Sequence, residues 1–276
     1  MQKDDQGQAN VEVRSLGANI GAEVLGVDLR TTQTQENREV LARALLDNVV
    51  LVIRDQSLSP AQFRDGMALF GAPMRQHREK YNLEECPDVS IVTNKGGFGK
   101  ADMWHTDHTN HLEPPKITAL HAVVLPSSGG STWFANMYAA FSVLDEDERI
   151  RLRSLTTINS MEANPSYSDA DRARYAGGVE HPLVRTHPDT GREALYFHVT
   201  KSQGIPGMDD ERVRPFLEEL LDRTVKPDFV YKHTWRPGDV VMVDNRCAMH
   251  RAEHDYPPGE HRLLWRVILK GDRPRA

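Results

Sequence analysis

The sequence predicts a mainly β protein with flanking helices, built on a double-stranded β-helix (jelly-roll) core. Three observations support this fold class: short β-branched or aromatic runs fill the middle and C-terminal parts, turn sequences such as PSSGG, PDTG and RPGD separate them, and few helical patterns interrupt them. Such strands bury their apolar side chains by pairing into sheets that pack on each other. A jelly roll is the arrangement that we expect.

The N-terminal part of the chain alternates predicted strands with a predicted helix. Short runs at 11–16 and 22–29 are typical of strands. Residues 37–48 carry apolar side chains at i, i+1, i+4 and i+5, which indicates a helix with one buried face. The continuous apolar run at 49–54 favours a buried strand.

A second helix is expected to begin at Ser59–Pro60. Serine is a preferred N-cap, and proline fits the first turn of a helix, where its missing N–H costs no hydrogen bond. Gly71 is expected to end this helix.

The remainder of the chain is read as strands with two helical insertions. The expected strands are DVSIVTN, ITALHAVVL, STWFA, HPLVRTH, ALYFHV, DFVYKHTW, DVVMVD and LLWRVIL. The insertions lie at about 136–153 and at 209–223, and the second carries acidic residues in its first turn, as helices favour. No second core is indicated, so we expect residues 1–276 to form one domain, with an ordered core at about 11–272.

The composition argues against several kinds of partner. The net charge of −6 gives no reason to expect nucleic acid or an anionic membrane. No run approaches the roughly 18 apolar residues of a membrane span, and the polar start MQKDDQGQAN is not a signal peptide. Cys86 and Cys247 fit no zinc or CxxC spacing, so we expect reduced thiols in a cytoplasmic protein.

The stretch MWHTDHTN places His105 and Asp107 two positions apart. On an extended segment these two side chains point to the same side. Two histidines and one carboxylate leave positions open on Fe(II) for a cosubstrate and O2, which is why oxygenases use this set. The strand predicted at 240–244 is followed by a turn and then by His250, the candidate for the third ligand.

Two other interpretations of this stretch remain open at this point. Asp107 could cap a turn while His105 is a surface histidine. Alternatively, His105, His108 and His111 are spaced three apart, so on a helix they would share a face and could bind zinc. The following Pro114–Pro115 fits a loop or a strand better than a helix.

Blocks along the whole chain, from about residue 14 to 272, resemble the TauD/TfdA family of Fe(II)- and 2-oxoglutarate-dependent dioxygenases. The blocks are SLGANIGAEVLGVDL, NVVLVIRDQSLSPAQFRDGMALFG, WHTDHTNHLEPP, LPSSGGSTWFANMYAAF, HPLVRTHPDTGREAL, TVKPDFVYKHTWRPGDVVMVDNRCAMH and HRLLWRVILKGDRP. The resemblance implies an enzyme that binds Fe(2+) at His105, Asp107 and His250. It also implies 2-oxoglutarate and O2 as cosubstrates, with succinate and CO2 as coproducts.

Further residues receive roles from the same resemblance. Thr132 and Arg262 match the family's ligands for the distal carboxylate of 2-oxoglutarate. Taken alone, they would be a strand threonine and an exposed arginine, but a guanidinium fork binds a carboxylate in a bidentate way. The DNR turn at 244–246 is interpreted as structural, orienting His250. The histidines interpreted as core or surface residues are His121, His181, His187, His233, His254 and His261.

The substrate is expected to be a small anionic organic molecule. Arg266 lies four residues after Arg262, so on a strand both side chains face the same side, and in the family this second arginine binds the substrate's acidic group. The alternative is that Arg266 makes an internal ion pair. The other candidate substrate-binding residues are His108, Asn110, Asn94, His77 and Tyr81.

Several positions depart from the taurine-oxidising pattern. His108 and Asn110 stand where those enzymes have apolar residues, and Ala101 replaces an asparagine. A histidine expected shortly after the FG turn is matched only approximately, by Gln76 or His77. A carboxylate with polar or aromatic functionality therefore suits the site better than taurine, because buried polar side chains need partners.

The reaction implied is oxidation of an unactivated C–H bond, by hydroxylation (followed by cleavage in some cases) or by desaturation. Two alternatives from other classes remain: a zinc-dependent hydrolase or isomerase on a cupin-like barrel, and a non-catalytic binding protein. Thr132 and Arg262 discriminate, since a hydrolase needs no dedicated carboxylate clamp. By analogy with the family, we expect a homo-oligomer, either a dimer or a tetramer.

Overall fold

Pairing of the central strands creates the frame that positions the site. The computed structural model describes residues 11–76, 79–95, 101–161, 169, 173 and 177–276. The strands are β1 (Glu12–Ser15), β2 (Ala22–Leu25), β3 (Val50–Ile53), β4 (Pro73–Met74), β5 (Asn82–Leu83), β6 (Cys86–Thr93), β7 (Ile117–Val124), β8 (Thr132–Asn136), β9 (Thr156–Asn159), β10 (Val179–Pro182), β11 (Val184–Thr186), β12 (Glu193–Leu195), β13 (Ser202–Gly204), β14 (Val230–His233), β15 (Val240–Asp244), β16 (Ala248–Ala252) and β17 (Leu263–Leu269). The helices are α1 (Gln35–Asn48), α2 (Pro60–Met67), α3 (Met137–Ser142), α4 (Glu146–Arg153) and α6 (Asp210–Thr224), with the 3-10 turns η1 (Ala68–Phe70), η2 (Glu79–Tyr81) and η3 (Pro227–Phe229).

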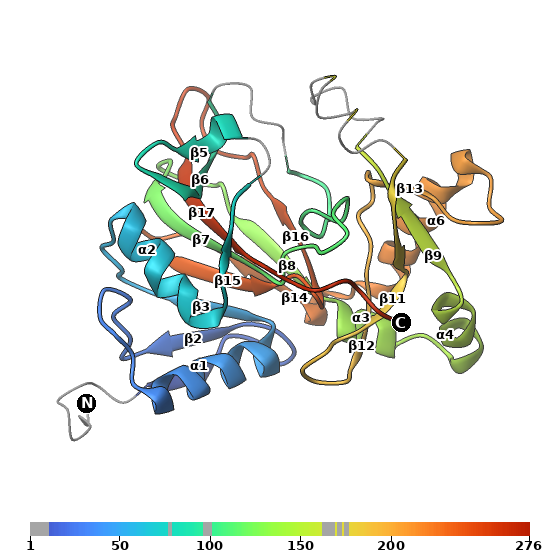
Figure 1. Cartoon of the computed structure of the whole chain (residues 1–276), viewed down its shortest axis with the longest axis horizontal. Coiled ribbons are helices and arrows are strands. Elements are labelled where there is room, and N and C mark those ends of the chain that lie inside the picture. Colours follow the sequence, from blue (N-terminus) through green and yellow to red (C-terminus); the bar gives the residue numbers. More distant parts are fainter. Residues whose placement is uncertain (1–10, 77–78, 96–100, 162–168, 170–172, 174–176) are drawn as a thin grey trace.

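The large sheet has the order β1-β2-β3-β15-β7-β17-β6-β5, with β4 added beside β17. Its pairs are antiparallel except for β2 with β3. A smaller sheet, β14-β8-β16, lies over it. Two further small sheets, β10-β9-β13 and β11-β12, lie beside α3, α4 and α6, and these elements together are called the helical part (Figure 1). Two antiparallel sheets packed in this way confirm the predicted jelly-roll core.

The side chains of β15 alternate between two hydrophobic clusters. Val241 and Val243 pack with buried residues of β8, β16, α3 and α6, whereas Val240 and Met242 pack with buried residues of α1 and α2. This is the period-two alternation of a strand that is covered on both sides. The two clusters are therefore the two faces of one sheet. The single domain stays a prediction.

The N-terminal helices begin where their caps place them. Thr34 accepts a hydrogen bond from the backbone of Asn37 and starts α1, two residues before the predicted helix. Ser59 and Gln62 form a capping box that starts α2 at Pro60, as predicted. The α-helix ends at Met67, and the chain up to Gly71 tightens into a 3-10 turn.

The two helical insertions also exist, but the first is two helices. Asn136 caps α3, and Asp145 caps α4. A second N-cap inside the predicted segment 136–153 requires a break between the helices, because an N-cap residue is not itself helical. The segment 209–223 is confirmed as α6. Figure 1 shows α4 and α6 at the end of the molecule opposite α1 and α2.

Two strand predictions needed correction. The strand at 240–244 and the turn before His250 are confirmed, but His250 lies in a further strand that was not predicted: it is the central residue of β16, which pairs with β8. The run AMHRA contains no β-branched residue, so its backbone pairing leaves little trace in the sequence. The predicted strand ALYFHV is shorter in the structure, where β12 ends at Leu195, although the N–H of Tyr196 still donates to Leu183 O at 2.8 Å in register with β11.

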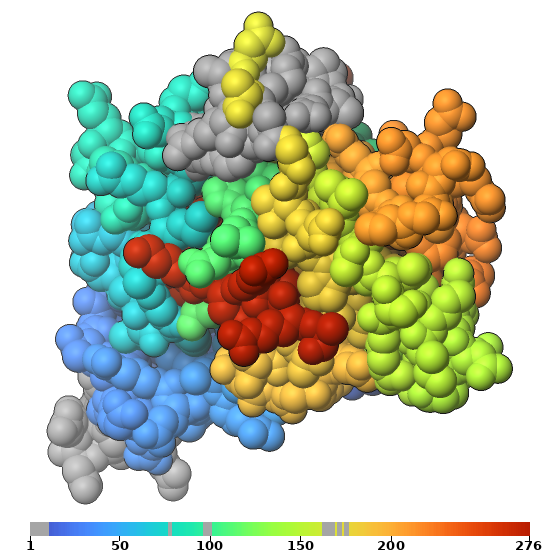
Figure 2. All heavy atoms as spheres, turned by 45° about the vertical axis from the view of Figure 1, so that its right-hand side comes forward, coloured from blue at the N-terminus to red at the C-terminus, as the bar shows by residue number. Residues whose placement is uncertain are grey.

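The C-terminal segment is hydrogen-bonded to the rest of the chain as far as Arg275. The backbone N–H of Thr186 donates to Arg275 O at 2.8 Å, and Arg185 pairs with Asp272 at 3.3 Å. Figure 2 shows the C-terminal atoms, in red, on the surface of the molecule. Within the described residues, no helix is long and apolar enough to cross a membrane.

Candidate active site

Three side chains with metal-binding atoms converge between the two sheets. His105 and His250 exchange backbone hydrogen bonds of 3.0 and 2.9 Å, which form an isolated antiparallel bridge. His105 Nε2 lies 3.9 Å from Asp107 Oδ1, and His250 Nε2 lies 3.9 Å from Asp107 Oδ2. All three ligand atoms lie within 4.8 Å of one another. A single metal ion could be bound by all three.

The backbone around Asp107 fixes this geometry. Thr106 Oγ1 donates to Ala248 O at 3.1 Å, which ties the segment to β16. Asp107 begins a turn rather than continuing an extended segment, and His108 has a φ of 52°. This left-handed conformation is uncommon for a residue with a side chain, and it turns the chain away directly after the carboxylate.

Hydrogen bonds orient the ligands themselves. His105 Nδ1–H donates to Met103 O at 2.9 Å, so Nε2 is the nitrogen left for a metal. Thr118 Oγ1 donates to Asp107 Oδ2 at 2.6 Å, and Asn245 Nδ2 in turn donates to Thr118 Oγ1 at 2.9 Å. Partners of this kind hold a ligating carboxylate in one orientation.

The protonation states suit a divalent cation. Burial lowers the pKa of His105, and burial with the nearby His105 charge lowers the pKa of His250 to about 3. Burial opposes ionisation of Asp107, but the charges of His250 and Arg266 hold its pKa well below its usual value. Neutral imidazoles and an ionised carboxylate are the forms that bind metals. The three residues therefore fit Fe(II).

At one end of the site, a hydroxyl and a guanidinium form a carboxylate-binding pair. Thr132 Oγ1 accepts from Trp235 Nε1 at 3.0 Å and from Arg262 Nη2 at 3.3 Å. Both acceptor positions of the hydroxyl are then used, so its own proton is free to be donated to a ligand. Arg262 is 5% exposed, and its Nε donates to Gly130 O at 3.1 Å.

The charge of Arg262 has no partner of opposite sign in the described part of the chain. Burial lowers the pKa of Arg262 to about 10, which leaves it a cation at neutral pH. A buried cation without a counter-charge is costly. Beside a free hydroxyl proton, it fits one carboxylate end of 2-oxoglutarate.

One cavity joins this end to the metal-binding group. Its volume is about 100 Å³, well above the roughly 10–15 Å³ that one water requires. Its walls combine the polar groups described above with apolar side chains. The lining residues are Val92, Thr93, Asn94, Ala101, His105, Asp107, Thr118, Leu120, Thr132, His250, Ala252, His254, Tyr256, Arg262, Leu264 and Arg266.

Two of the predicted substrate-binding residues line the cavity. Arg266 is half-buried on β17, and its Nε donates to Ser90 Oγ at 3.3 Å. Asn94 also lines the cavity, but its side chain is occupied by the backbone: Oδ1 accepts from Arg262 N at 3.0 Å, and Nδ2 donates to Glu260 O at 2.7 Å. Asn94 therefore supports the Arg262 end rather than facing the substrate.

The other predicted substrate-binding residues lie elsewhere. His108 and Asn110 are buried in the turn after Asp107, next to the site but outside the lining of the cavity. Tyr81 is buried in η2 and is likewise not among the described lining residues. His77 lies outside the described residues.

Three further residues near the site received no role from the sequence. His198 was assigned no role, yet its ring lies 5.4 Å from the ring of His105. Lys201 Nζ donates to Asn110 Oδ1 at 3.0 Å, although both residues are buried. Trp235 is interpreted from the sequence only as part of the turn motif WRPGD. The tryptophan in WRPGD was the available signal for the third residue; the first two lie in a loop with no motif.

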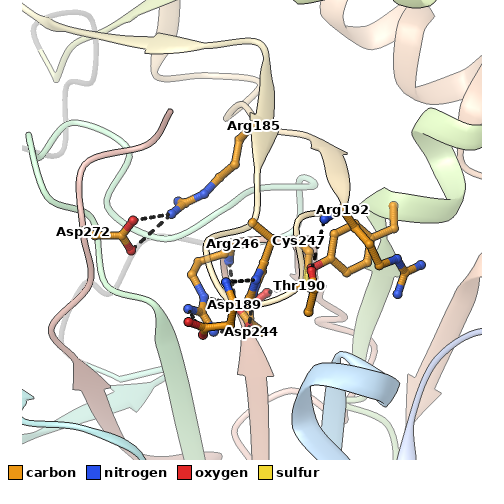
Figure 3. Close-up of polar contacts among 10 residues, drawn as sticks. Arg185, Asp189, Thr190, Arg192, Asp244, Arg246, Cys247 and Asp272 are labelled. Carbon is orange, nitrogen blue, oxygen red and sulfur yellow. Dashed lines mark hydrogen bonds and ion pairs between the residues drawn. The ribbon is translucent and has the colours of Figure 1, made fainter. Parts of the chain in front are cut away.

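A second group of possible metal ligands, His187, Asp244 and Cys247, is better explained as structural. Arg246 donates to both oxygens of Asp244, at 2.9 and 2.7 Å, and also pairs with Asp189 at 2.7 Å (Figure 3). A cation placed there would be repelled by the guanidinium. The network supports the DNR turn that precedes β16, as predicted.

The helical zinc site of His105, His108 and His111 does not form. His108 and His111 lie in a turn closed by the bond from His111 N to His108 O at 2.9 Å. Among the described residues, neither joins a group able to hold a metal ion. The other alternative, a surface loop, is also wrong, because Asp107 is 7% exposed and faces both histidines.

Comparison with known proteins gives a consistent result. The family described as taurine catabolism dioxygenase TauD, TfdA matches residues 12–268. The (S)-phenoxypropionate/alpha-ketoglutarate-dioxygenase of Sphingobium herbicidovorans is 32% identical over 95% of this chain and 95% of its own. The alpha-ketoglutarate-dependent 2,4-dichlorophenoxyacetate dioxygenase of Cupriavidus pinatubonensis is 32% identical over 92% of this chain and 95% of its own.

The fold is also shared with a solved structure. A taurine dioxygenase from Burkholderia xenovorans superposes with a TM-score of 0.84 at 30% identity, covering 96% of this chain and 90% of the other. The superposition extends over nearly the whole of both chains, so it includes the two sheets and every element that contributes a metal ligand.

Proposed function

The chain belongs to the taurine catabolism dioxygenase TauD, TfdA family, and from that premise we propose that it oxidises a small organic carboxylate held by Arg266. It is an enzyme, an Fe(II)- and 2-oxoglutarate-dependent dioxygenase that uses O2. The chemistry that iron supplies when bound is the oxidative decarboxylation of 2-oxoglutarate to succinate and CO2, coupled to oxidation of an unactivated C–H bond.

The protein's own residues bind and orient the reactants. His105, Asp107 and His250 hold the metal, with Thr118 fixing the carboxylate of Asp107. Arg262 and Thr132 bind the distal carboxylate of 2-oxoglutarate. A zinc hydrolase has no use for such a pair, and a binding protein needs no metal site beside it. The apolar walls of the cavity exclude water from the reacting carbon.

The observation that carries the substrate class is the position of Arg266. It lines the same cavity as the metal ligands, and its Nε donates only to the neutral Ser90 hydroxyl. No acidic residue in the described part of the chain forms an ion pair with it, which removes the support for an internal ion pair. Its charge helps to lower the pKa of Asp107, after His250, and this places it near the site of reaction.

A carboxylate is favoured over a sulfonate as the acidic group. A guanidinium fork matches both oxygens of a carboxylate. The related enzymes named for phenoxypropionate and 2,4-dichlorophenoxyacetate carry carboxylate substrates in their names. Aryl and aryloxy carboxylates are therefore the first compounds to test.

The test measures substrate-dependent succinate formation with a panel of carboxylates and matched sulfonates. Arg266→Ala should lower kcat/KM for the active acid by about 10- to 100-fold, the value of a charged hydrogen bond. Its 2-oxoglutarate affinity should be unchanged. Arg266→Lys should have a kcat/KM between those of wild type and Arg266→Ala. The exposed Arg43→Ala is the control. Equal turnover of an uncharged substrate by wild type and Arg266→Ala would refute the proposal.

The location and assembly of the chain are part of this proposal. Cys86 and Cys247 are both free and buried, which supports a reducing compartment such as the cytoplasm. We propose a dimer or tetramer by analogy with the family. Light scattering during gel filtration tests this assembly, and a monomeric mass at micromolar concentration would contradict it.

A further inference from the structure

His198 lies beside the metal-binding group in a loop that holds its ring rigidly. Its ring is 5.4 Å from the ring of His105, and the residue is 9% exposed. The backbone N–H groups of Lys201 and Ser202 both donate to His198 O, at 3.2 and 2.9 Å. These bonds close a tight turn that fixes the backbone from which the imidazole projects.

The same turn decides which ring nitrogen carries the proton. The backbone N–H groups of Thr200 and Lys201 point at His198 Nδ1, at 3.2 and 3.3 Å. A nitrogen that accepts hydrogen bonds cannot carry a proton, so the proton of the neutral ring lies on Nε2. Nε2 bonds to no residue in the described part of the chain. It is a fixed donor whose acceptor is still to be supplied.

The surroundings of His198 favour a negatively charged acceptor. Lys201 is 9% exposed, and its Nζ donates to Asn110 Oδ1 at 3.0 Å. Burial is the main cause that lowers the pKa of His198, and the charge of Lys201 is the next. At His105 the charge of Lys201 acts in the same direction, but less strongly than burial, the charge of Asp107 and the hydrogen bond to Met103. An ammonium group is therefore close to both rings.

We propose that His198 and Lys201 form a second recognition site for the substrate, specific for an oxygen atom with partial or full negative charge. This inference rests on the proposed function, in which Arg266 holds the substrate's carboxylate. The substrate then has a second acceptor oxygen, such as an ether oxygen, which receives the Nε2–H bond. The site is distinct from the Thr132–Arg262 pair, which serves the cosubstrate.

A matched pair of acids tests the proposal. Phenoxyacetate and 3-phenylpropanoate have the same length and charge and differ only in an ether oxygen replaced by CH2. Their binding is measured by calorimetry on the anaerobic protein loaded with Fe(II) and 2-oxoglutarate. Wild type should bind phenoxyacetate about fivefold more tightly, the value of one neutral hydrogen bond.

Variants identify the residue that causes the preference for phenoxyacetate over 3-phenylpropanoate. His198→Phe, which keeps a ring but loses the donor, should bind both acids about equally and bind 2-oxoglutarate as wild type does. Lys201→Met should weaken the binding of phenoxyacetate more than that of 3-phenylpropanoate. His121→Phe is the control: His121 is also buried, but it packs against Phe63 and Trp265 away from the cavity, and its variant should keep the preference.

The outcomes separate two kinds of failure. If both acids bind but wild type shows no preference, or His198→Phe retains it, the second site is refuted and the role of Arg266 stands. If neither acid binds while 2-oxoglutarate does, the aryloxy carboxylate class of the proposed function is wrong, and this inference is overturned with it.

Discussion

At one end of the cavity, Trp235 and Arg262 both hydrogen-bond to Thr132 before any ligand arrives. Elsewhere in its lining, the side chain of Arg266 donates, among the described residues, only to Ser90, and His198 lies beyond it next to His105. The first end is preorganised for a cosubstrate that is the same in every turnover. The second region presents separate charges and donors from different elements. The contrast predicts that substitutions at Arg266 or His198 change the use of the organic substrate without changing the use of 2-oxoglutarate.

His250 lies on β16 and Thr132 on its neighbour β8, so the largest effect should follow from weakening the support of β16. Asp244 is buried between Arg246 and His187, so Asp244→Asn should lower the free energy of unfolding by about 3–5 kcal/mol. Denaturant titration measures this loss. Glu219→Gln, an exposed change on α6, should have no comparable effect.

Wild type and Asp244→Asn also test how the free energy of unfolding depends on pH. Burial opposes ionisation of Asp244, but hydrogen bonds from His187 and Arg246 lower its pKa below the ordinary value. The stabilisation is then fully present above the unfolded pKa of about 3.9 and is lost as pH falls toward the folded value. The difference between wild type and Asp244→Asn should shrink below pH 4. A constant difference down to pH 2 would contradict the assignment.

A smaller effect, confined to the cosubstrate end, is expected from Arg262→Ala. Loss of a charged hydrogen bond should raise the KM for 2-oxoglutarate by about 10- to 100-fold, whereas Thr132→Ala loses a neutral one and should raise it less. The KM of the organic substrate should change little. Equal effects on both KM values would show that the two ends are not separate.

The smallest predicted effect belongs to Trp235→Phe. Phenylalanine keeps an aromatic ring beside Arg262 but removes the N–H that occupies an acceptor position of Thr132. The Thr132 hydroxyl is then less firmly oriented, so the KM for 2-oxoglutarate should rise by about 2- to 10-fold with kcat unchanged. In the Thr132→Ala background the same change should have almost no effect, since the two act through one bond.

The sequence allowed the cosubstrate end to be predicted because its residues lie in contiguous motifs. His105 and Asp107 share one motif, and Thr132, Arg262 and Arg266 lie on predicted strands whose alternation fixes the side that each faces. His198 could not be found in this way. It reaches His105 through a turn of the helical part, and no local pattern encodes that tertiary contact. Asn94 lines the cavity, but its bonds to two backbone groups could not be predicted, because they are visible only in the folded chain.

The central claim is that His105, Asp107 and His250 bind Fe(II) in the cavity that also binds 2-oxoglutarate. Anaerobic titration with both should produce the weak visible charge-transfer band of the chelate at one equivalent of iron. Arg262→Ala should give the same band at higher 2-oxoglutarate concentration. His250→Ala, checked for folding by circular dichroism, should give none and should not turn over substrate. A full band or full activity in His250→Ala would contradict the account.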